Sequence, residues 1–214
     1  AASDVYKRQV KTNIHILLER ELRRRSRNRE FGFIALSSAT EPWMYIEEKY
    51  RVTRRCLEVI ARYRFPVHCL TKSPLILRDL DLSERIEREA ILPGDLRGKV
   101  NHGVLVTFSI ATLDESIAKI FEPNAPKPQD RLNALSKIKE QGFYAGIAYM
   151  PILPYISDSD QELEEMVKTV KDLGADYVFF SPLTLYGTGK SIYFKILERY
   201  FPHLVDKYMA MYKG

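Results

Sequence analysis

A short apolar run that ends in hydroxyl-bearing or charged residues recurs along this chain, and a stretch of helical periodicity follows most copies. The runs lie at residues 31–36, 67–73, 104–112, 144–151 and 177–182. Apolar runs bounded by turn residues are typical of strands buried on both faces. Their spacing of roughly 30–40 residues fits repeated strand–helix units. Strands joined by helical crossovers are parallel, so the pattern predicts an α/β fold with a parallel sheet or barrel.

Composition places the chain among ordinary globular proteins. Its 214 residues suit one domain, and 45% are hydrophobic while 29% are charged. No apolar run is long enough to span a bilayer and no signal-peptide pattern is visible, so we expect a cytoplasmic protein without a membrane partner. Residues 1–9 resemble a translated cloning adaptor, and we expect a single domain over residues 10–214. Cys56 and Cys69 fall within a helical and a strand pattern, which predicts two core residues.

Ligands of parallel α/β folds bind at the carboxyl ends of the strands. The segments that follow the predicted strands carry polar side chains and prolines: Ser37, Ser38, Thr40, Glu41, Lys72, Ser73, Ser109, Thr112, Pro151, Ser181 and Thr184. Lys72 directly follows an apolar run, so its ammonium group either binds an anionic ligand or pairs with a loop carboxylate. Both interpretations stay open at this point.

A cluster of arginines near the start of the chain also has two interpretations. It comprises Arg20, Arg23, Arg24, Arg25, Arg27 and Arg29. Cations suit the carboxyl end of a helix, which favours a solvated helix terminus. A patch that contacts the phosphates of a nucleic acid is the alternative.

Two further motifs are weak. Residues 187–191 (GTGKS) follow the last predicted strand, but Thr184 stands where the phosphate-binding loop motif requires glycine. The histidines are scattered and show no spacing suited to a metal ion.

Several segments resemble the radical S-adenosylmethionine (SAM) superfamily. They are residues 34–42 (IALSSATEP), 52–58 (VTRRCLE), 70–79 (LTKSPLILRD) and 108–114 (FSIATLD). Residues 121–126 (FEPNAP), followed by Arg131 and Leu132, are similar to the branch related to spore photoproduct lyase. The resemblance covers about residues 10–190, with the motifs in the order of the family.

The resemblance implies a partial barrel of β/α units that binds SAM and a [4Fe–4S] cluster at the strand tips. The cluster would cleave SAM reductively to a 5′-deoxyadenosyl radical, with electrons from a reductant such as flavodoxin or ferredoxin. By position, Thr40 and Glu41 resemble the stretch near the methionyl amine. Lys72 and Ser109 resemble the residues at the SAM carboxylate, and Pro151 begins a later SAM-contacting segment.

The sequence departs from the family in two places. The C-x-x-x-C-x-x-C motif is absent, and Cys56 and Cys69 cannot replace it because cluster ligands must gather in one place. The resemblance therefore implies a fragment whose first strand and cluster loop precede residue 10. In addition, Ser38 stands where photoproduct lyases carry a hydrogen-donating cysteine, which argues against the same repair reaction.

Two other functions remain as alternatives. The first is a non-catalytic barrel that binds nucleic acid through Arg23, Arg24, Arg25, Arg27 and Arg29. The second is a phosphate-binding barrel that uses Lys72 and residues 187–191.

Overall fold

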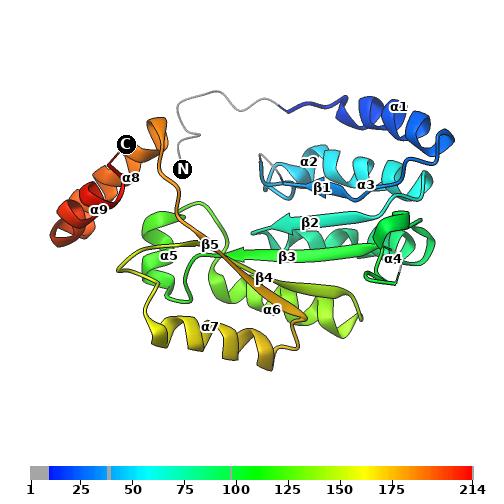
Figure 1. Cartoon of the computed structure of the whole chain (residues 1–214). Helices are drawn as coiled ribbons and strands as arrows, with labels where there is room; N and C mark the ends of the chain where they lie inside the picture. Colours follow the sequence, from blue (N-terminus) through cyan, green and yellow to red (C-terminus); the bar gives the residue numbers. More distant parts are fainter. Residues whose placement is uncertain (1–9, 38–39, 97, 214) are drawn as a thin grey trace.

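Figure 1 shows a computed structural model of the chain, which describes residues 10–37, 40–96 and 98–213. A five-stranded sheet runs in sequence order, and every neighbouring pair is parallel. Its strands are β1 (Ile34–Leu36), β2 (Val67–Thr71), β3 (Val104–Ile110), β4 (Tyr144–Ile152) and β5 (Tyr177–Pro182). The predicted parallel α/β fold is confirmed, while residues 1–9 and Ser38 lie outside the described residues.

Helices precede, connect and follow the strands. They are α1 (Ile14–Arg27), α2 (Glu47–Tyr50), α3 (Val52–Arg62), α4 (Leu80–Glu89), α5 (Glu115–Phe121), α6 (Pro128–Glu140), α7 (Asp160–Asp172), α8 (Gly187–Tyr200) and α9 (Val205–Met211). Short 3₁₀ helices lie at η2 (Pro74–Asp79), η3 (Gly94–Leu96) and η4 (Pro202–Leu204). In the part of the chain that the structure describes, none of these helices has the length and apolar character needed to cross a membrane.

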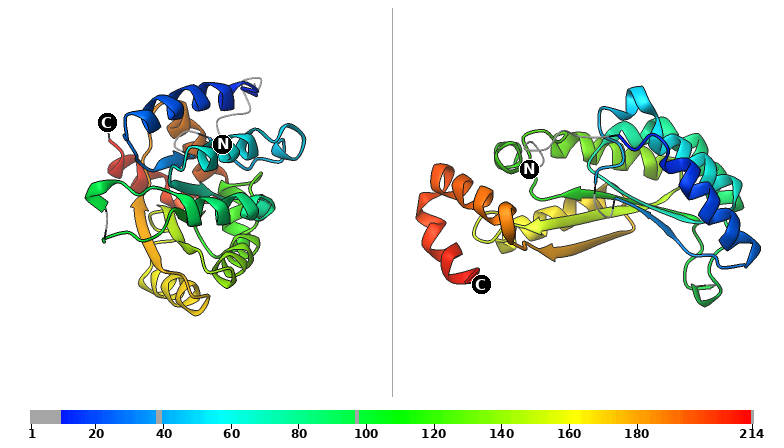
Figure 2. Two further views of the ribbon diagram at one scale, coloured as in Figure 1. Left: turned by 90° about the vertical axis from the view of Figure 1, so that its right-hand side faces the viewer. Right: turned by 90° about the horizontal axis from the view of Figure 1, so that it is seen from above.

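One face of the sheet packs against α3, α4, α6 and α7, as the end view in Figure 2 shows. The alternation along each strand decides which side chains enter this core. Cys69 of β2, Val106 of β3 and Ala145 of β4 lie side by side in the strand register and are 0% exposed. Their neighbours His68 and Leu105 point to the opposite face. We call that opposite face the inner face.

Side chains cap two of the helices at their amino ends. Asp114 caps α5, because its Oδ1 accepts hydrogen bonds from the backbone N–H groups of Ser116 and Ile117 at 2.7 and 3.2 Å. Ser159 caps α7 by accepting one from Glu162 N. Asn13 precedes α1, and its side chain makes no capping bond.

The first strand is shorter than the sequence predicts. The apolar run begins at Phe31, whereas β1 covers only Ile34–Leu36. Phe31 instead packs its ring 5.0 Å from that of Phe65. The apolar residues at the start of this segment therefore pack against the core without pairing as part of the strand.

The carboxyl-terminal helices form a second, smaller core. It contains Leu153, Ile156, Tyr193, Leu197, Leu204 and Tyr208. Figure 2 shows α8 and α9 beyond the end of the sheet at which the strands finish. Phe121, the last residue of α5, joins this core through its ring contact with Tyr193 at 5.2 Å. The small core therefore lies beside the strand tips.

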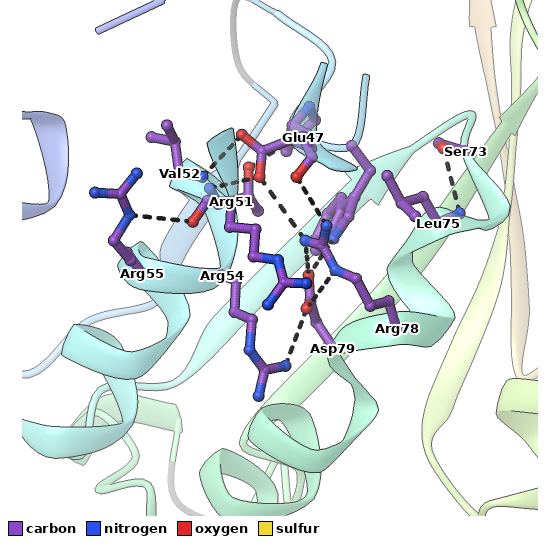
Figure 3. A network of polar contacts seen from close by, with 12 residues as sticks. Glu47, Arg51, Val52, Arg54, Arg55, Ser73, Leu75, Arg78 and Asp79 are labelled. Carbon is purple, nitrogen blue, oxygen red and sulfur yellow. Dashed lines mark hydrogen bonds and ion pairs between the residues drawn. The ribbon is translucent and has the colours of Figure 1, made fainter. Parts of the chain in front are cut away.

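A buried carboxylate, Asp79, connects the loop after β1 with the segment after β2. It is 0% exposed and accepts hydrogen bonds from Trp43 Nε1 at 2.9 Å and from Arg54 Nη1 at 3.1 Å. Arg78 donates to both of its oxygens at 2.9 and 2.8 Å. The same guanidinium donates to the backbone oxygen of Glu47 at 2.9 Å, which extends the network to α2 (Figure 3).

We expect the substitution Asp79→Ala to lower the free energy of unfolding by about 3 kcal/mol, because it removes the buried acceptor that two guanidinium groups and an indole N–H share. Asp81→Ala is the matched control, since Asp81 pairs with the same Arg54 but its side chain is 57% exposed. That control should cost less than about 1 kcal/mol. Urea unfolding measures both, and equal losses would contradict a special role for the buried carboxylate.

Candidate functional site

The side chain of Glu41 joins the tips of β1 and β2. Its Oε1 accepts hydrogen bonds from Trp43 N at 3.0 Å and from Thr71 Oγ1 at 2.5 Å. Its Oε2 accepts one from the backbone N–H of Lys72 at 2.7 Å. Both carboxylate oxygens are therefore used within the chain, and Glu41 holds the backbone of Lys72 in place.

Lys72 forms an ion pair with Glu122, which directly follows α5. The other oxygen of Glu122 accepts a hydrogen bond from Arg131 Nη2 at 2.7 Å. The two cations differ in accessibility, since the side chain of Lys72 is 33% exposed and that of Arg131 is 1% exposed. Lys72 is thus the cation of this cluster that solvent or a ligand can reach.

Arg131 fastens three segments together from the first turns of α6. Its Nη1 donates to Ser109 O at the end of β3, at 2.7 Å. Its Nε and Nη2 both donate to Pro126 O, at 2.9 and 2.7 Å. The planar guanidinium has donors in several directions, which suits it to this task. Arg131 therefore sets the position of Glu122 relative to the strand tips.

Opposing effects act on the carboxyl group of Glu122. Burial alone would raise its pKa, but the charges of Lys72 and Arg131 and their hydrogen bonds lower it further than burial raises it. The net pKa of Glu122 lies below its ordinary value, so this carboxylate is ionised at neutral pH.

The structure brings most of the predicted cofactor-binding residues to one end of the sheet. Ser109 Oγ donates a hydrogen bond to Met150 O at 3.2 Å, which places it beside Pro151 of β4. Lys72 follows β2, and Glu41 reaches it from the loop after β1. Thr40 is exposed on that loop. Ser38 lies outside the described residues.

Glu122 and Arg131 are absent from the site residues predicted by sequence, although both lie in the segment that is similar to the photoproduct lyase branch. Their signal was a carboxylate and an arginine near a proline-rich loop. Nothing in that spacing shows that Glu122 would meet Lys72, which is 50 residues away. The ion pair with a loop carboxylate, one of the two interpretations of Lys72, is present in the structure.

Neither cysteine is placed to ligate iron. Cys56 lies in α3 and Cys69 in β2, and both are buried, as the sequence predicts. Burial raises the pKa of the Cys56 thiol to about 11 and that of Cys69 to about 12, whereas a metal ligand must be a thiolate. Within residues 10–37, 40–96 and 98–213, no group of three histidine, cysteine, aspartate or glutamate side chains could hold a metal ion.

The arginine cluster is partly neutralised by its own helix. Arg24 and Arg25 pair with Glu21 at 2.8 and 2.7 Å, and Arg23 donates to Tyr63 OH at 3.1 Å. Arg27 and Arg29 are exposed. Because α1 leads into the start of β1, the cluster lies at the end of the sheet opposite to the strand tips (Figure 1). The structure therefore does not join these arginines to the site around Lys72.

Comparison with known proteins finds no family model that matches this chain. An uncharacterized protein of Mycobacterium tuberculosis is 29% identical over 204 residues, which are 95% of this chain and 56% of that protein. The uncharacterized protein ORF301 of Acidianus two-tailed virus is 34% identical over 151 residues, 68% of this chain and 44% of its own length. This chain thus spans about half the length of the relatives that it matches.

Two solved structures share its fold. Spore photoproduct lyase complexed with dinucleoside spore photoproduct superposes with a TM-score of 0.60 and 17% identity, over 90% of this chain and 52% of that one. Streptococcus suis SuiB bound to S-adenosylmethionine gives a TM-score of 0.57 and 16% identity, over 94% of this chain and 43% of that one. The partial barrel implied by the resemblance to the radical SAM superfamily is confirmed at the level of the fold.

The lowered pKa of Glu122 predicts how the stability of the fold depends on pH. Such a group stabilises the fold at pH values above its unfolded pKa, and this contribution is lost as the pH falls through its folded pKa. Glu122→Gln should therefore destabilise the chain at pH 7 and do so progressively less below the ordinary glutamate pKa of about 4.3. Urea unfolding at several pH values tests this. A loss that is independent of pH would contradict it.

A second prediction concerns iron. When the chain is incubated with ferrous iron and sulfide under reducing conditions, it should not retain a stoichiometric [4Fe–4S] cluster, because such a cluster is held by several thiolates and the two cysteines of this chain are both buried. The visible absorbance and the iron content after gel filtration measure this. The double substitution of Cys56 and Cys69 by serine is the control and should bind the same residual iron. A stoichiometric cluster lost in the double variant would overturn the prediction.

Proposed function

We propose that this chain forms the SAM-binding part of a radical SAM enzyme, with Lys72 as the contact for the methionyl carboxylate. The observation that carries the proposal is the placement of Lys72: a partly exposed ammonium group at the carboxyl end of a parallel strand, held by Glu122. The shared fold with SuiB, whose structure contains SAM, supports the same assignment.

The donors of Lys72 fit a carboxylate. An ammonium group has three N–H donors, and Glu122 offers it one oxygen. The second oxygen of Glu122 is bound to Arg131, whose buried charge would lose its counter-ion if Glu122 moved away. Glu122 therefore stays in place and orients Lys72, which keeps donors free for a ligand.

Other residues near Lys72 have supporting roles. Glu41 positions Lys72 and accepts two hydrogen bonds on Oε1 but only one on Oε2, which leaves an acceptor site for the methionyl amine, so Glu41 stays a predicted contact of that amine. Ser109 uses its hydrogen on Met150 O, which leaves its oxygen as an acceptor for a donor group of the ligand. Thr40 and Pro151 remain predicted contacts on the rim of the same site.

When bound in an enzyme of this superfamily, SAM supplies a carbon radical that takes a hydrogen atom from the substrate. The iron–sulfur cluster that releases it does not fit the cysteines described above, so the proposal gives this chain the SAM side of the site alone. The substrate and the reductant are not assigned. The neighbouring structures hold different molecules, a precursor peptide in SuiB and a dinucleoside photoproduct in the lyase.

The substitution Lys72→Ala in the full-length protein tests this proposal. Loss of one charge-assisted hydrogen bond costs about 1.5–3 kcal/mol, so the affinity for SAM should fall about ten- to a hundredfold. Lys127→Ala serves as the matched control, because Lys127 also pairs with a glutamate but its side chain is 67% exposed. Titration calorimetry with SAM measures both variants. Unchanged affinity in the folded Lys72 variant would assign this lysine to a structural ion pair.

A further inference from the structure

A chain of hydrogen bonds crosses the inner face of the sheet. His68 Nε2 lies 2.7 Å from Thr107 Oγ1, and Thr107 Oγ1 lies 2.6 Å from Tyr177 OH. Tyr177 OH also donates to Val106 O at 3.0 Å. These hydrogen bonds thus join β2, β3 and β5.

Tyr177 reaches β3 by lying across β4 at Gly146. A Cβ atom at Gly146 would be 2.6 Å from the ring carbon Cδ2 of Tyr177, closer than real Cβ atoms approach. Thr107, Gly146 and Tyr177 are neighbours in the strand register, so the ring spans one row of the sheet. The same Cβ atom would overlap with the backbone oxygen of Tyr177, so glycine at this position makes room both for the backbone of β5 and for the ring whose hydroxyl takes part in the hydrogen bonds.

One arrangement of protons serves all three contacts. Val106 O can only accept, so it takes the phenol hydrogen of Tyr177. The oxygen of Tyr177 then accepts the hydrogen of Thr107, whose hydroxyl has no other to give. Thr107 Oγ1 must in turn accept from His68, which places the imidazole proton on Nε2. It follows that Nδ1 of a neutral His68 carries a lone pair.

The environment agrees with these protonation states. Burial raises the pKa of Tyr177 to about 12, so its hydroxyl keeps the hydrogen that it donates. Burial also lowers the pKa of His68, which favours the neutral imidazole at neutral pH.

Nδ1 of His68 is open to the inner face. Among the described residues no hydrogen bond reaches this atom, and the one buried side-chain atom without a partner there is Nδ1 of His15. Nδ1 of His68 is therefore not fully buried, and the residue as a whole is half-buried. His68 and Lys72 are four residues apart on the same strand and its extension, about 13 Å along it.

We propose that Nδ1 of His68 is a ligand-binding point on the inner face, which accepts a hydrogen bond from a neutral N–H or O–H group of the substrate. The proposal rests on the proposed function only for placing a substrate over the inner face. The hydrogen-bond chain that fixes the proton on Nε2 is independent of SAM.

The protonation state can be measured directly. The chain contains four histidines, so ¹⁵N-histidine labelling gives few signals, and His68→Gln identifies the signal of His68. At pH 7 we expect His68 to be neutral with its proton on Nε2. His102 is an internal contrast, because its Nδ1 lies 2.7 Å from the carboxylate of Glu87 and should carry a proton. A proton on Nδ1 of His68 would overturn the proposal.

Tyr177→Phe tests the origin of this state. The ring still fits over Gly146, but the hydrogen of Thr107 is no longer held by the phenol oxygen and can turn to His68 Nε2. We expect the ¹⁵N signals to shift toward the form with the proton on Nδ1. Signals identical to those of the unaltered chain would show that Thr107 does not control the imidazole, and would overturn the argument.

A pair of small probes tests the binding point itself. Succinimide offers one imide N–H, and N-methylsuccinimide has the same shape without it. Succinimide should move the Nδ1 signal of His68 in a titration, while N-methylsuccinimide should not. No response to either probe, or an equal response to both, would overturn the proposal. Neither result depends on SAM, so a failure here is separable from a failure of Lys72→Ala to weaken SAM binding.

Discussion

The buried carboxylate of Asp79 is the interaction on which the geometry of the strand tips depends. It holds the indole of Trp43 at 2.9 Å, and Trp43 lies in the loop that carries Glu41. Glu41 in turn fixes the backbone of Lys72 at 2.7 Å. A fully buried charge is costly unless cations and donors surround it, and the guanidinium groups of Arg54 and Arg78 meet that requirement. The position of Lys72 therefore depends on the carboxylate of Asp79, which is fully buried and out of reach of any ligand.

Glu122 is built on the same principle but stands closer to solvent. Each of the two carboxylates contacts more than one cation, which offsets the cost of burial. At Asp79 both arginines bind within the network that joins the loops. At Glu122 the buried partner, Arg131, fixes the carboxylate. The partly exposed partner, Lys72, has further N–H donors that the bond to Glu122 does not use. This difference in accessibility separates a structural ion pair from one that can serve a ligand.

Much of the sheet could be predicted from sequence, because apolar runs of this length are buried wherever the chain folds. The burial of Cys69 and the place of Lys72 after β2 followed from that pattern. The partner of Lys72 could not be predicted, since its contact with Glu122 spans 50 residues and depends on how α5 ends. The role of Glu41 could not be predicted either, because it depends on the hydrogen bonds that its carboxylate accepts from Thr71 and two backbone N–H groups. Sequence patterns report burial and periodicity, and these contacts arise only when loops from different strands meet.

The sheet is also polarised from its tips to its interior. The five described strands contain no aspartate, glutamate, lysine or arginine, so the charges of the site are confined to the segments that follow them. Below Lys72 the inner face presents Leu70, Thr107 and a neutral His68. A ligand with an ionic end and an uncharged end is therefore best accommodated in one direction, with the ionic end at Lys72, because moving a charge toward the apolar strands would remove it from water without a partner. Orientation would then follow from the distribution of charge along the strands, before any specific contact forms.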